Sequence, residues 1–202
     1  MTILADLDKI VLASGNPGKI RGFQALLADH PVVPQHRYAV PEAKETGLTF
    51  VENAIIKARN AALHCNLPAL ADDSGLVVDA LQGAPGVISA RYAGIGASDQ
   101  DNLVKLLEDM DGVPDRQRSA RFVCVIVFMR HAQDPVPVIA QGVWEGSILK
   151  RPVGENGFGY DPVFWVPDKG CASAELSPED KNAISHRGQA LHRLLAQLSD
   201  CG

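Results

Sequence analysis

The chain of 202 residues has no excess of basic residues, no cysteine motif and no long apolar run. Lys and Arg total 19 against 24 Asp and Glu, so the net charge of −5 argues against a dedicated duplex-DNA binder. The four cysteines are far apart and form no C-x-x-C pair, which argues against a disulfide framework or a zinc site. The longest apolar run, residues 122–129, is far too short to span a membrane.

The first residues also lack the features of a secretory signal, because residues 1–8 contain two acids and no long apolar core. We therefore expect a protein of the reducing cytoplasm, with neither a membrane nor a nucleic-acid polymer among its partners. No internal repeat, low-complexity segment or linker interrupts the chain. The length suits one sizeable domain or two small lobes that share a core, and we predict a single domain over residues 1–202.

The hydrophobic pattern predicts an α/β fold with a mixed sheet. Apolar runs alternate with helical patterns in the first half, and apolar runs then dominate until a last helical pattern. Residues 120–129 are almost wholly apolar, which is typical of a strand covered on both faces, so we place them at the centre of the sheet. Residues 31–40 contain prolines and are predicted to form an edge strand or a hairpin arm.

Two adjacent carboxylates, Asp72 and Asp73, follow a short apolar run and precede Ser74 and Gly75. Alternation along a strand would direct the two acids to opposite faces, so at most one points into any given site. Because acids are poor strand formers, we predict that the strand ends at them and that Ser74-Gly75 forms a tight turn. An ordinary turn and a site for Mg²⁺ or phosphate are both compatible with this stretch.

A glycine-rich loop joins a predicted strand to a predicted helix near the N-terminus. It consists of Ser14, Gly15, Asn16, Pro17, Gly18 and Lys19. Backbone N–H groups and the helix dipole would face an anion there, and Lys19 adds a cation, so we favour phosphate binding over a plain connection. The loop is no P-loop, because Ala13 and Ile20 stand where that motif needs Gly and Ser or Thr, which argues against a P-loop kinase or ATPase.

The next predicted helix begins at a capping box formed by Thr49 and Glu52 and runs to about Cys65. One of its faces is polar and is either solvated or directed at a ligand; it carries Asn53, Lys57, Asn60 and His64. Lys57 is the functional candidate on this face.

Two later segments contain residues suited to a nucleotide. Residues 154–162 hold three glycines and two aromatics, of which Phe158 or Tyr160 could stack on a base or lie in the core instead. Residues 185–188 open the last helix with His186 and Arg187 in its first turn, where the helix dipole favours acids. Cations in that position indicate an anionic ligand or a pairing with a nearby acid.

Six motifs, in order along nearly the whole chain, resemble the inosine triphosphate pyrophosphatase family, whose bacterial branch comprises the dITP/XTP pyrophosphatases. They are S-G-N-P-G-K at 14–19, E-T-G-L-T-F-V-E-N-A at 45–54, A-D-D-S-G-L at 71–76, G-A-P-G-V-I-S-A-R-Y at 83–92, G-F-G-Y-D-P at 157–162 and K-N-A-I-S-H-R-G-Q-A-L at 181–191. Ser14 stands where many relatives have Thr. The resemblance implies an elongated mixed β-sheet flanked by helices, two lobes with a cleft between them, and a homodimer.

The resemblance also implies an activity, namely Mg²⁺-dependent hydrolysis of the deaminated purine nucleoside triphosphates dITP, ITP and XTP to the monophosphate and pyrophosphate, which keeps them out of DNA and RNA. It assigns Asp73 as general base and metal contact, and Glu45 as a second metal carboxylate. The implied substrate contacts are Ser14, Gly15, Asn16, Pro17, Gly18, Lys19, Lys57, Ser74, Phe158, Gly159, Tyr160, Asp161, Lys181, His186 and Arg187.

Two other functions stay open at the level of the sequence. A Maf-like nucleotide pyrophosphatase would have a related architecture and another base preference. A non-catalytic nucleotide-binding module is the second alternative. Asp73 and Glu45 argue against it, since a pure binder needs no acid to activate water.

Overall fold

The structure is a computed structural model that describes residues 9–27, 30 and 32–200. The chain forms two compact units whose segments interleave in sequence. Unit 1 comprises the described residues within 1–73, 124–142 and 187–202, and unit 2 comprises residues 74–123 and 143–186. Residues 1–8, which we expected to contain no secretory signal, and Cys201 lie outside the described part.

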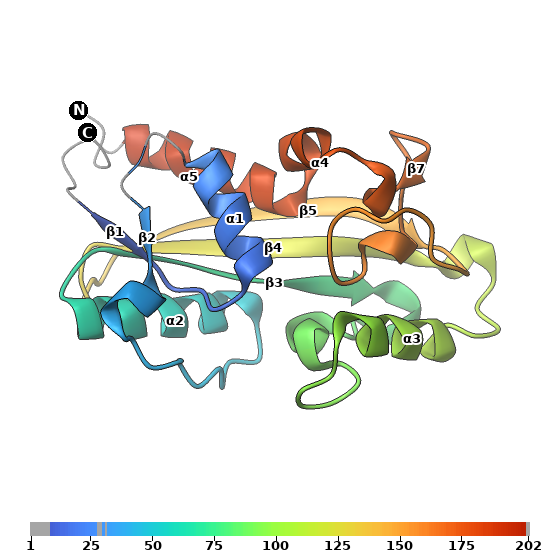
Figure 1. The fold of residues 1–202 in the computed structure, drawn as a ribbon, viewed down its shortest axis with the longest axis horizontal. Coiled ribbons are helices and arrows are strands. Elements are labelled where there is room, and N and C mark those ends of the chain that lie inside the picture. The colour runs from blue at the N-terminus through green and yellow to red at the C-terminus, as the bar shows by residue number, and fades with distance from the viewer. Residues whose placement is uncertain (1–8, 28–29, 31, 201–202) are drawn as a thin grey trace. The chain divides into compact units, whose positions relative to one another are not determined.

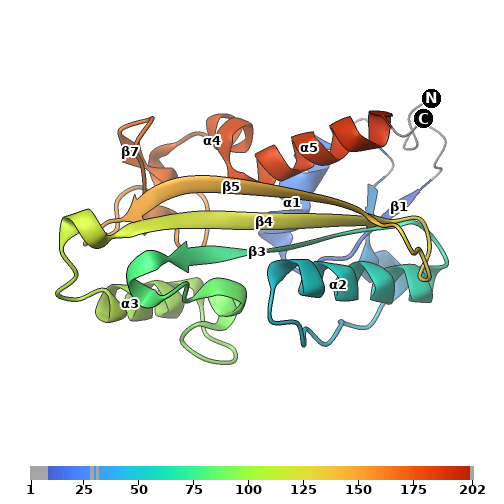
Figure 2. The ribbon, with the colours of Figure 1, turned by 180° about the vertical axis from the view of Figure 1, so that it is seen from behind.

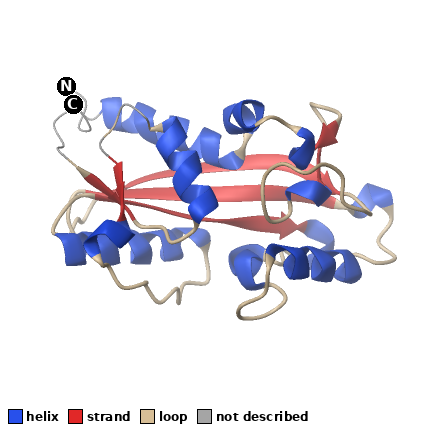
Figure 3. Cartoon of the chain, viewed as in Figure 1, coloured by secondary structure: helices blue, strands red, loops and turns tan. Residues whose placement is uncertain are grey.

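Helices and strands alternate in the first half of the chain, and strands then dominate, as the hydrophobic pattern predicts; two α-helices, rather than one, end the chain (Figures 1 and 3). The strands are β1 Ile10–Leu12, β2 Val32–Pro34, β3 Ala69–Val78, β4 Ser119–Met129, β5 Val138–Ile148, β6 Phe164–Val166 and β7 Cys171–Ala172. The α-helices are α1 Pro17–Leu26, α2 Phe50–Cys65, α3 Asp99–Asp109, α4 Pro178–Ile184 and α5 His186–Asp200. Short 3₁₀ segments connect several of them, including Gln35–Tyr38 and Gly86–Arg91.

Within the described residues, seven strands form one hydrogen-bonded sheet in the order β2-β1-β3-β4-β5-β6-β7. The pairs β1–β2 and β1–β3 are parallel, whereas β5–β6 and β6–β7 are antiparallel. The predicted mixed α/β sheet with flanking helices is therefore confirmed. The apolar strand β4 is the fourth in the order, as expected for the centre of the sheet.

The edge position predicted for residues 31–40 is confirmed over β2 alone, since Pro31 is not described and a 3₁₀ segment follows Pro34. The hairpin alternative is wrong, because β2 pairs with β1 in parallel and a two-stranded hairpin is antiparallel.

In unit 1, α1 and α5 bury apolar side chains against the strands. Phe23 of α1 and Leu194 of α5 share a hydrophobic cluster with Leu12, Leu70 and Ile126. Full burial of such a side chain contributes about 1.5–3 kcal/mol relative to exposure. Figures 1 and 2 show α5 on one side of the strands of this unit and α2 on the other.

The helix α2 packs through small residues and begins where the sequence predicts. Ala54, Ala58 and Ala61 are fully buried along one stripe. Thr49 accepts a hydrogen bond from the Glu52 N–H, and the Glu52 side chain accepts from the Thr49 N–H, so the predicted capping box is present.

Unit 2 has its own core, in which aromatic rings pack together. The rings of Phe122 and Phe164 have centroids 4.5 Å apart, and Trp144 lies 5.2 Å from Phe164. Leu103 and Leu106 of α3 belong to the same cluster. Among the described residues, no helix combines the length and apolar character needed to cross a membrane.

The predicted strand end at Asp72-Asp73 is wrong. Strand β3 continues through both acids and through Ser74 and Gly75 to Val78, without a turn. Intrinsic strand propensity is weak and depends on context. Here it is outweighed because β3 lies between β1 and β4 in the sheet and because both acids find cationic partners.

Candidate functional site

The two adjacent acids of unit 1 point to opposite faces of β3, as strand alternation predicts. On one face the Asp72 carboxylate lies 2.9 Å from the Lys19 ammonium of α1 and 3.9 Å from the Arg187 guanidinium of α5. On the other face the Asp73 carboxylate meets Lys57 of α2 at 2.8 Å. The two acids therefore act in two different groups of charges.

Asp72 is 1% exposed. Burial by itself would raise the pKa of Asp72, but the nearby charges of Lys19, Arg187 and Lys57 outweigh it and hold that pKa well below its usual range. Asp72 thus pairs with two cations, Lys19 near the N-terminus of α1 and Arg187 near the N-terminus of α5. Cys124 lies beside it, with its Sγ 3.9 Å from Asp72. Burial and the Asp72 charge raise the pKa of this thiol to about 12, so Cys124 is a neutral core residue.

Asp73 is 5% exposed and lies in a second group with Lys57 and Glu45. The Lys57 ammonium is 3.1 Å from Glu45 Oε1 and 2.8 Å from Asp73 Oδ1. Burial raises the pKa of Asp73 above its usual value in spite of the opposing charge of Lys57. Asp73 is therefore a better proton acceptor than an ordinary aspartate.

Lys57 keeps its charge in this group. Burial alone would lower the pKa of Lys57, yet the nearby charges of Asp72, Asp73 and Glu45 raise it above the ordinary value. One ammonium thus neutralises part of a cluster of acids.

The glycine-rich loop lies at the N-terminus of α1, as predicted. Asn16 caps the helix, and its side-chain oxygen accepts from the N–H groups of Gly18 at 2.8 Å and Lys19 at 3.1 Å. Ser14 accepts from the Asn16 N–H at 3.3 Å. These bonds fix the loop that places Lys19 beside Asp72.

The polar face of α2 holds the segment that carries Glu45. Asn53 accepts from the Gly47 N–H at 2.8 Å, and Asn60 donates to the Pro41 carbonyl at 2.8 Å. The sequence left a solvated and a ligand-directed face open, and the structure shows that this face binds a neighbouring loop. The sequence reasoning missed the part played by Asn53, although its place at i−4 from Lys57 was a usable signal.

In unit 2, Asp161 organises the glycine-aromatic loop. This side chain is 3% exposed, and its Oδ2 accepts from the Phe158 N–H at 2.8 Å and pairs with the Lys181 ammonium. Its Oδ1 accepts from the Ser173 hydroxyl at 2.9 Å. Gly157 has φ of +82°, and a Cβ there would overlap the Asp161 carboxylate, so the loop requires glycine at that position.

The two aromatics of this loop have different environments. Phe158 is 39% exposed, and the Lys181 ammonium lies 5.3 Å from its ring centroid in a cation–π contact. Tyr160 is buried in the core of unit 2, and its hydroxyl donates to the Ser89 carbonyl at 2.8 Å. Phe158 is therefore the aromatic that is available for stacking on a ligand.

The remaining predicted residues of unit 2 are Ser74, Gly159 and His186. Ser74 is half-buried on β3. His186 is buried, and its ring stacks on Phe122 with centroids 4.8 Å apart and an interplanar angle of 13°. Gly159 donates its N–H to Asp99 at 2.9 Å.

The chemistry of Glu45 and Asp73 suits a magnesium ion. Within the described residues, no three His, Cys, Asp or Glu side chains group as a metal site. Two carboxylates nevertheless converge on one cation here, because both contact the Lys57 ammonium. Mg²⁺ is typically bound by one or two carboxylates together with the phosphates of a substrate, so this donor set fits the ion.

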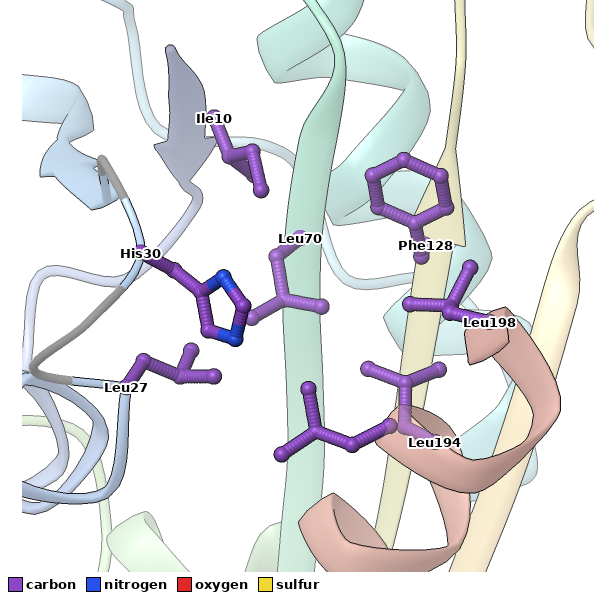
Figure 4. A pocket seen from close by; sticks show the side chains of 8 residues that line it. Ile10, Leu27, His30, Leu70, Phe128, Leu194 and Leu198 are labelled. Carbon is purple, nitrogen blue, oxygen red and sulfur yellow. The ribbon is translucent and has the colours of Figure 1, made fainter. Parts of the chain in front are cut away.

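Unit 1 also contains an apolar pocket of about 10 Å³, which is near the lower limit for one water molecule (Figure 4). Its walls are Ile10, Leu27, His30, Leu70, Phe128, Leu194, Leu195 and Leu198. None of the predicted site residues is among them, and we assign no ligand to it.

Comparison with known proteins identifies the family. The sequence pattern of the Ham1 family matches residues 10–197. The dITP/XTP pyrophosphatase of Vibrio cholerae is 61% identical, with 96% of this chain and 98% of the relative covered. The enzyme of the same name from Yersinia pestis is 59% identical, with 96% and 100% covered.

Solved structures agree with the sequence matches. A HAM1 protein from Coxiella burnetii superposes with a TM-score of 0.88 at 54% identity, covering 95% of this chain and 98% of that one. The nucleoside-triphosphatase/dITP/XTP pyrophosphatase of Mycobacterium abscessus gives a TM-score of 0.74 at 43% identity, covering 93% and 98%. The chain therefore belongs to the Ham1 family.

Proposed function

We propose that this chain hydrolyses the deaminated purine nucleoside triphosphates dITP, ITP and XTP to the monophosphate and pyrophosphate. The names of its relatives support the substrate class. The main support from the chain itself is the convergence of the Asp73 and Glu45 carboxylates on the Lys57 ammonium, at 2.8 and 3.1 Å. A buried carboxylate beside a cation suits the activation of water next to a phosphate.

In this proposal Asp73 orients the attacking water and accepts its proton at a carboxylate oxygen. The water oxygen forms a bond to the α-phosphorus, and the bond from that phosphorus to the bridging oxygen of the leaving pyrophosphate breaks. Glu45 and Asp73 would hold Mg²⁺, which when bound neutralises charge on the leaving group. Lys57 supplies positive charge beside the same carboxylates.

The other residues bind substrate. Residues 14–19 and Arg187 bind the triphosphate through backbone N–H groups and cations. Phe158 stacks on the base, and Lys181, His186 and the backbone near Gly159 surround the nucleoside, with Ser74 as a further contact. Asp161 and Tyr160 belong to this set as residues that hold the loop, because the side chains of both are buried and hydrogen-bonded.

We further propose that residues 1–202 act as one pyrophosphatase domain, as a homodimer in the cytoplasm. The resemblance to the inosine triphosphate pyrophosphatase family supports this organisation. Light scattering on the purified protein measures the mass of the assembly, and a monomeric mass would contradict the dimer.

The decisive experiment supplies the purified protein with Mg²⁺ and dITP, XTP, GTP or dATP, and identifies the phosphate products. We expect pyrophosphate, with dITP and XTP preferred. Release of orthophosphate would contradict attack at the α-phosphorus. A preference for dATP would contradict the proposed substrate class.

A further inference from the structure

Asn53 of α2 is completely buried between the loop that carries Glu45 and the carboxylate of Asp73. We propose that Asn53 is a positioning residue that sets the spacing of the Glu45–Asp73 pair, and thereby the affinity of this pair for a divalent cation. This inference rests on the proposed function and adds to it a residue that contacts neither substrate nor metal.

The amide of Asn53 bridges two segments that are far apart in sequence. Its oxygen accepts from the Gly47 N–H at 2.8 Å, and its nitrogen donates to Asp73 Oδ2 at 3.4 Å. The orientation of the amide follows from its partners, because a backbone N–H can only donate and an ionised carboxylate can only accept. Reversing the amide would lose both hydrogen bonds.

Asn53 and Lys57 together hold both oxygens of Asp73. Lys57 contacts Oδ1 at 2.8 Å, and Asn53 contacts Oδ2 at 3.4 Å. The two residues are four positions apart on α2 and therefore project from the same face. This arrangement restricts rotation of the Asp73 carboxylate.

The loop also lies directly against Asn53. A Cβ added to Gly47 would lie 2.7 Å from Asn53 Oδ1, so the backbone there approaches the amide more closely than any other residue type would allow. Glu45 is two residues before this contact and reaches Lys57 at 3.1 Å. Asn53 thus fixes the loop on one side and the strand on the other.

A neutral amide is the side chain that this position requires. It donates to one partner and accepts from the other without adding charge. A leucine of similar size would leave a buried N–H and a buried carboxylate oxygen without this partner. A serine is too short to reach both segments.

The chain offers a matched control in Asn60. This residue lies on the same face of α2 and also binds the segment before the helix, through the Pro41 carbonyl at 2.8 Å. Its bond is to the far end of that segment, so replacing it removes one loop contact and leaves the Asn53 bridge intact.

The experiment compares wild type, N53L, N53S and N60L. Mn²⁺ serves as the probe ion, and its binding is measured by electron paramagnetic resonance without nucleotide. Steady-state kcat and KM for dITP and the melting temperature are measured in parallel. For N53L and N53S we expect Mn²⁺ affinity and kcat to fall about 10–100-fold, the range found for residues that orient metal ligands, with KM unchanged. N60L should match wild type in Mn²⁺ affinity, kcat and KM.

Several results would overturn the inference. One is a folded N53L with wild-type Mn²⁺ affinity and kcat, and another is an N60L that loses as much as N53L. If N53L does not fold, a folded N53S with wild-type Mn²⁺ affinity and kcat would overturn the inference instead. Absence of saturable Mn²⁺ binding by wild type would also overturn it. A wild type that binds Mn²⁺ but hydrolyses neither dITP nor XTP would contradict the proposed function alone, and the Mn²⁺ affinities would still decide the part played by Asn53.

Discussion

At the scale of single residues, Asp72 and Asp73 differ because their surroundings differ. Both are buried, yet Asp72 is held ionised by Lys19 and Arg187, whereas burial dominates at Asp73 and raises its pKa. A residue that must take up a proton needs a pKa closer to neutrality. This contrast supports the proposed role of Asp73 as proton acceptor, whereas Asp72 pairs with the two cations.

Replacing Asp73 by Asn should leave the fold intact and reduce kcat for dITP by about 10²–10⁴-fold, the usual contribution of a general base. The reason is that an amide of the same size cannot accept the proton. Asp79→Asn is the control, because Asp79 forms an exposed ion pair with Arg121 in unit 2. Full activity of the Asp73 variant, with unchanged circular dichroism, would remove Asp73 from the mechanism.

At the scale of elements, the stability of the loop of residues 157–161 should depend more on Gly157 than on Gly159. Gly157 and Gly159 both have positive φ, at +82° and +62°. A Cβ on Gly157 would overlap the Asp161 carboxylate, whereas a Cβ on Gly159 would meet nothing within 4 Å.

We therefore expect Gly159→Ala to lower the free energy of unfolding by about 1–2 kcal/mol, the strain of a left-handed alanine. Gly157→Ala should lower it further, because the added methyl group displaces the carboxylate that holds Phe158 and Lys181. Urea unfolding of both variants measures the difference. Equal losses would show that Asp161 does not hold this loop.

The turn between β4 and β5 contains a carboxylate, Asp134, whose contribution to the free energy of unfolding should depend on pH. Asp134 is buried and accepts from the Arg130 side chain at 2.7 and 2.9 Å and from the N–H groups of Arg130 and Val136. These donors lower the pKa of Asp134 on folding. A lowered pKa stabilises the fold above the unfolded value of about 3.9 and ceases to do so as the pH falls through the folded value.

Asp134→Asn should accordingly lower the free energy of unfolding by about 1–3 kcal/mol at pH 7, because buried donors lose their charged acceptor. The difference from wild type should narrow as the pH falls below about 4. Asp115→Asn, which removes an exposed pair with Lys150, should lose at most about 1 kcal/mol. A difference that does not change between pH 7 and pH 3 would contradict this account of Asp134.

At the scale of the whole molecule, the net charge of −5 conceals local groups of cations that suit a phosphate ligand. A ligand that binds only the folded state stabilises it in proportion to the logarithm of its concentration. In the presence of Mg²⁺, pyrophosphate at a concentration 100 times its own dissociation constant should therefore raise the free energy of unfolding by about 2.7 kcal/mol. Thermal melts with and without chelator measure this effect, and an unchanged melting temperature would contradict pyrophosphate binding.

Local rules were sufficient to predict several features of the structure from the sequence. The alternation of side chains along a strand separated Asp72 from Asp73, because that geometry is set by the backbone of each residue. The capping box placed the start of α2, since its hydrogen bonds join residues three apart. The motifs of residues 14–19 and 181–191 lie in order along the chain, and the Ham1 family match covers both.

Features that depend on residues far apart in the sequence could not be predicted from local patterns. Strand β3 continues through two poor strand formers because Lys19, Arg187 and Lys57 meet them from three other elements. The burial of Tyr160 and the exposure of Phe158 follow from the packing of unit 2. Local patterns therefore predicted most elements and their chemical groups. Which charges pair, and which side chains are buried, depended on the fold, because electrostatic and packing energies depend on distance in space and not along the chain.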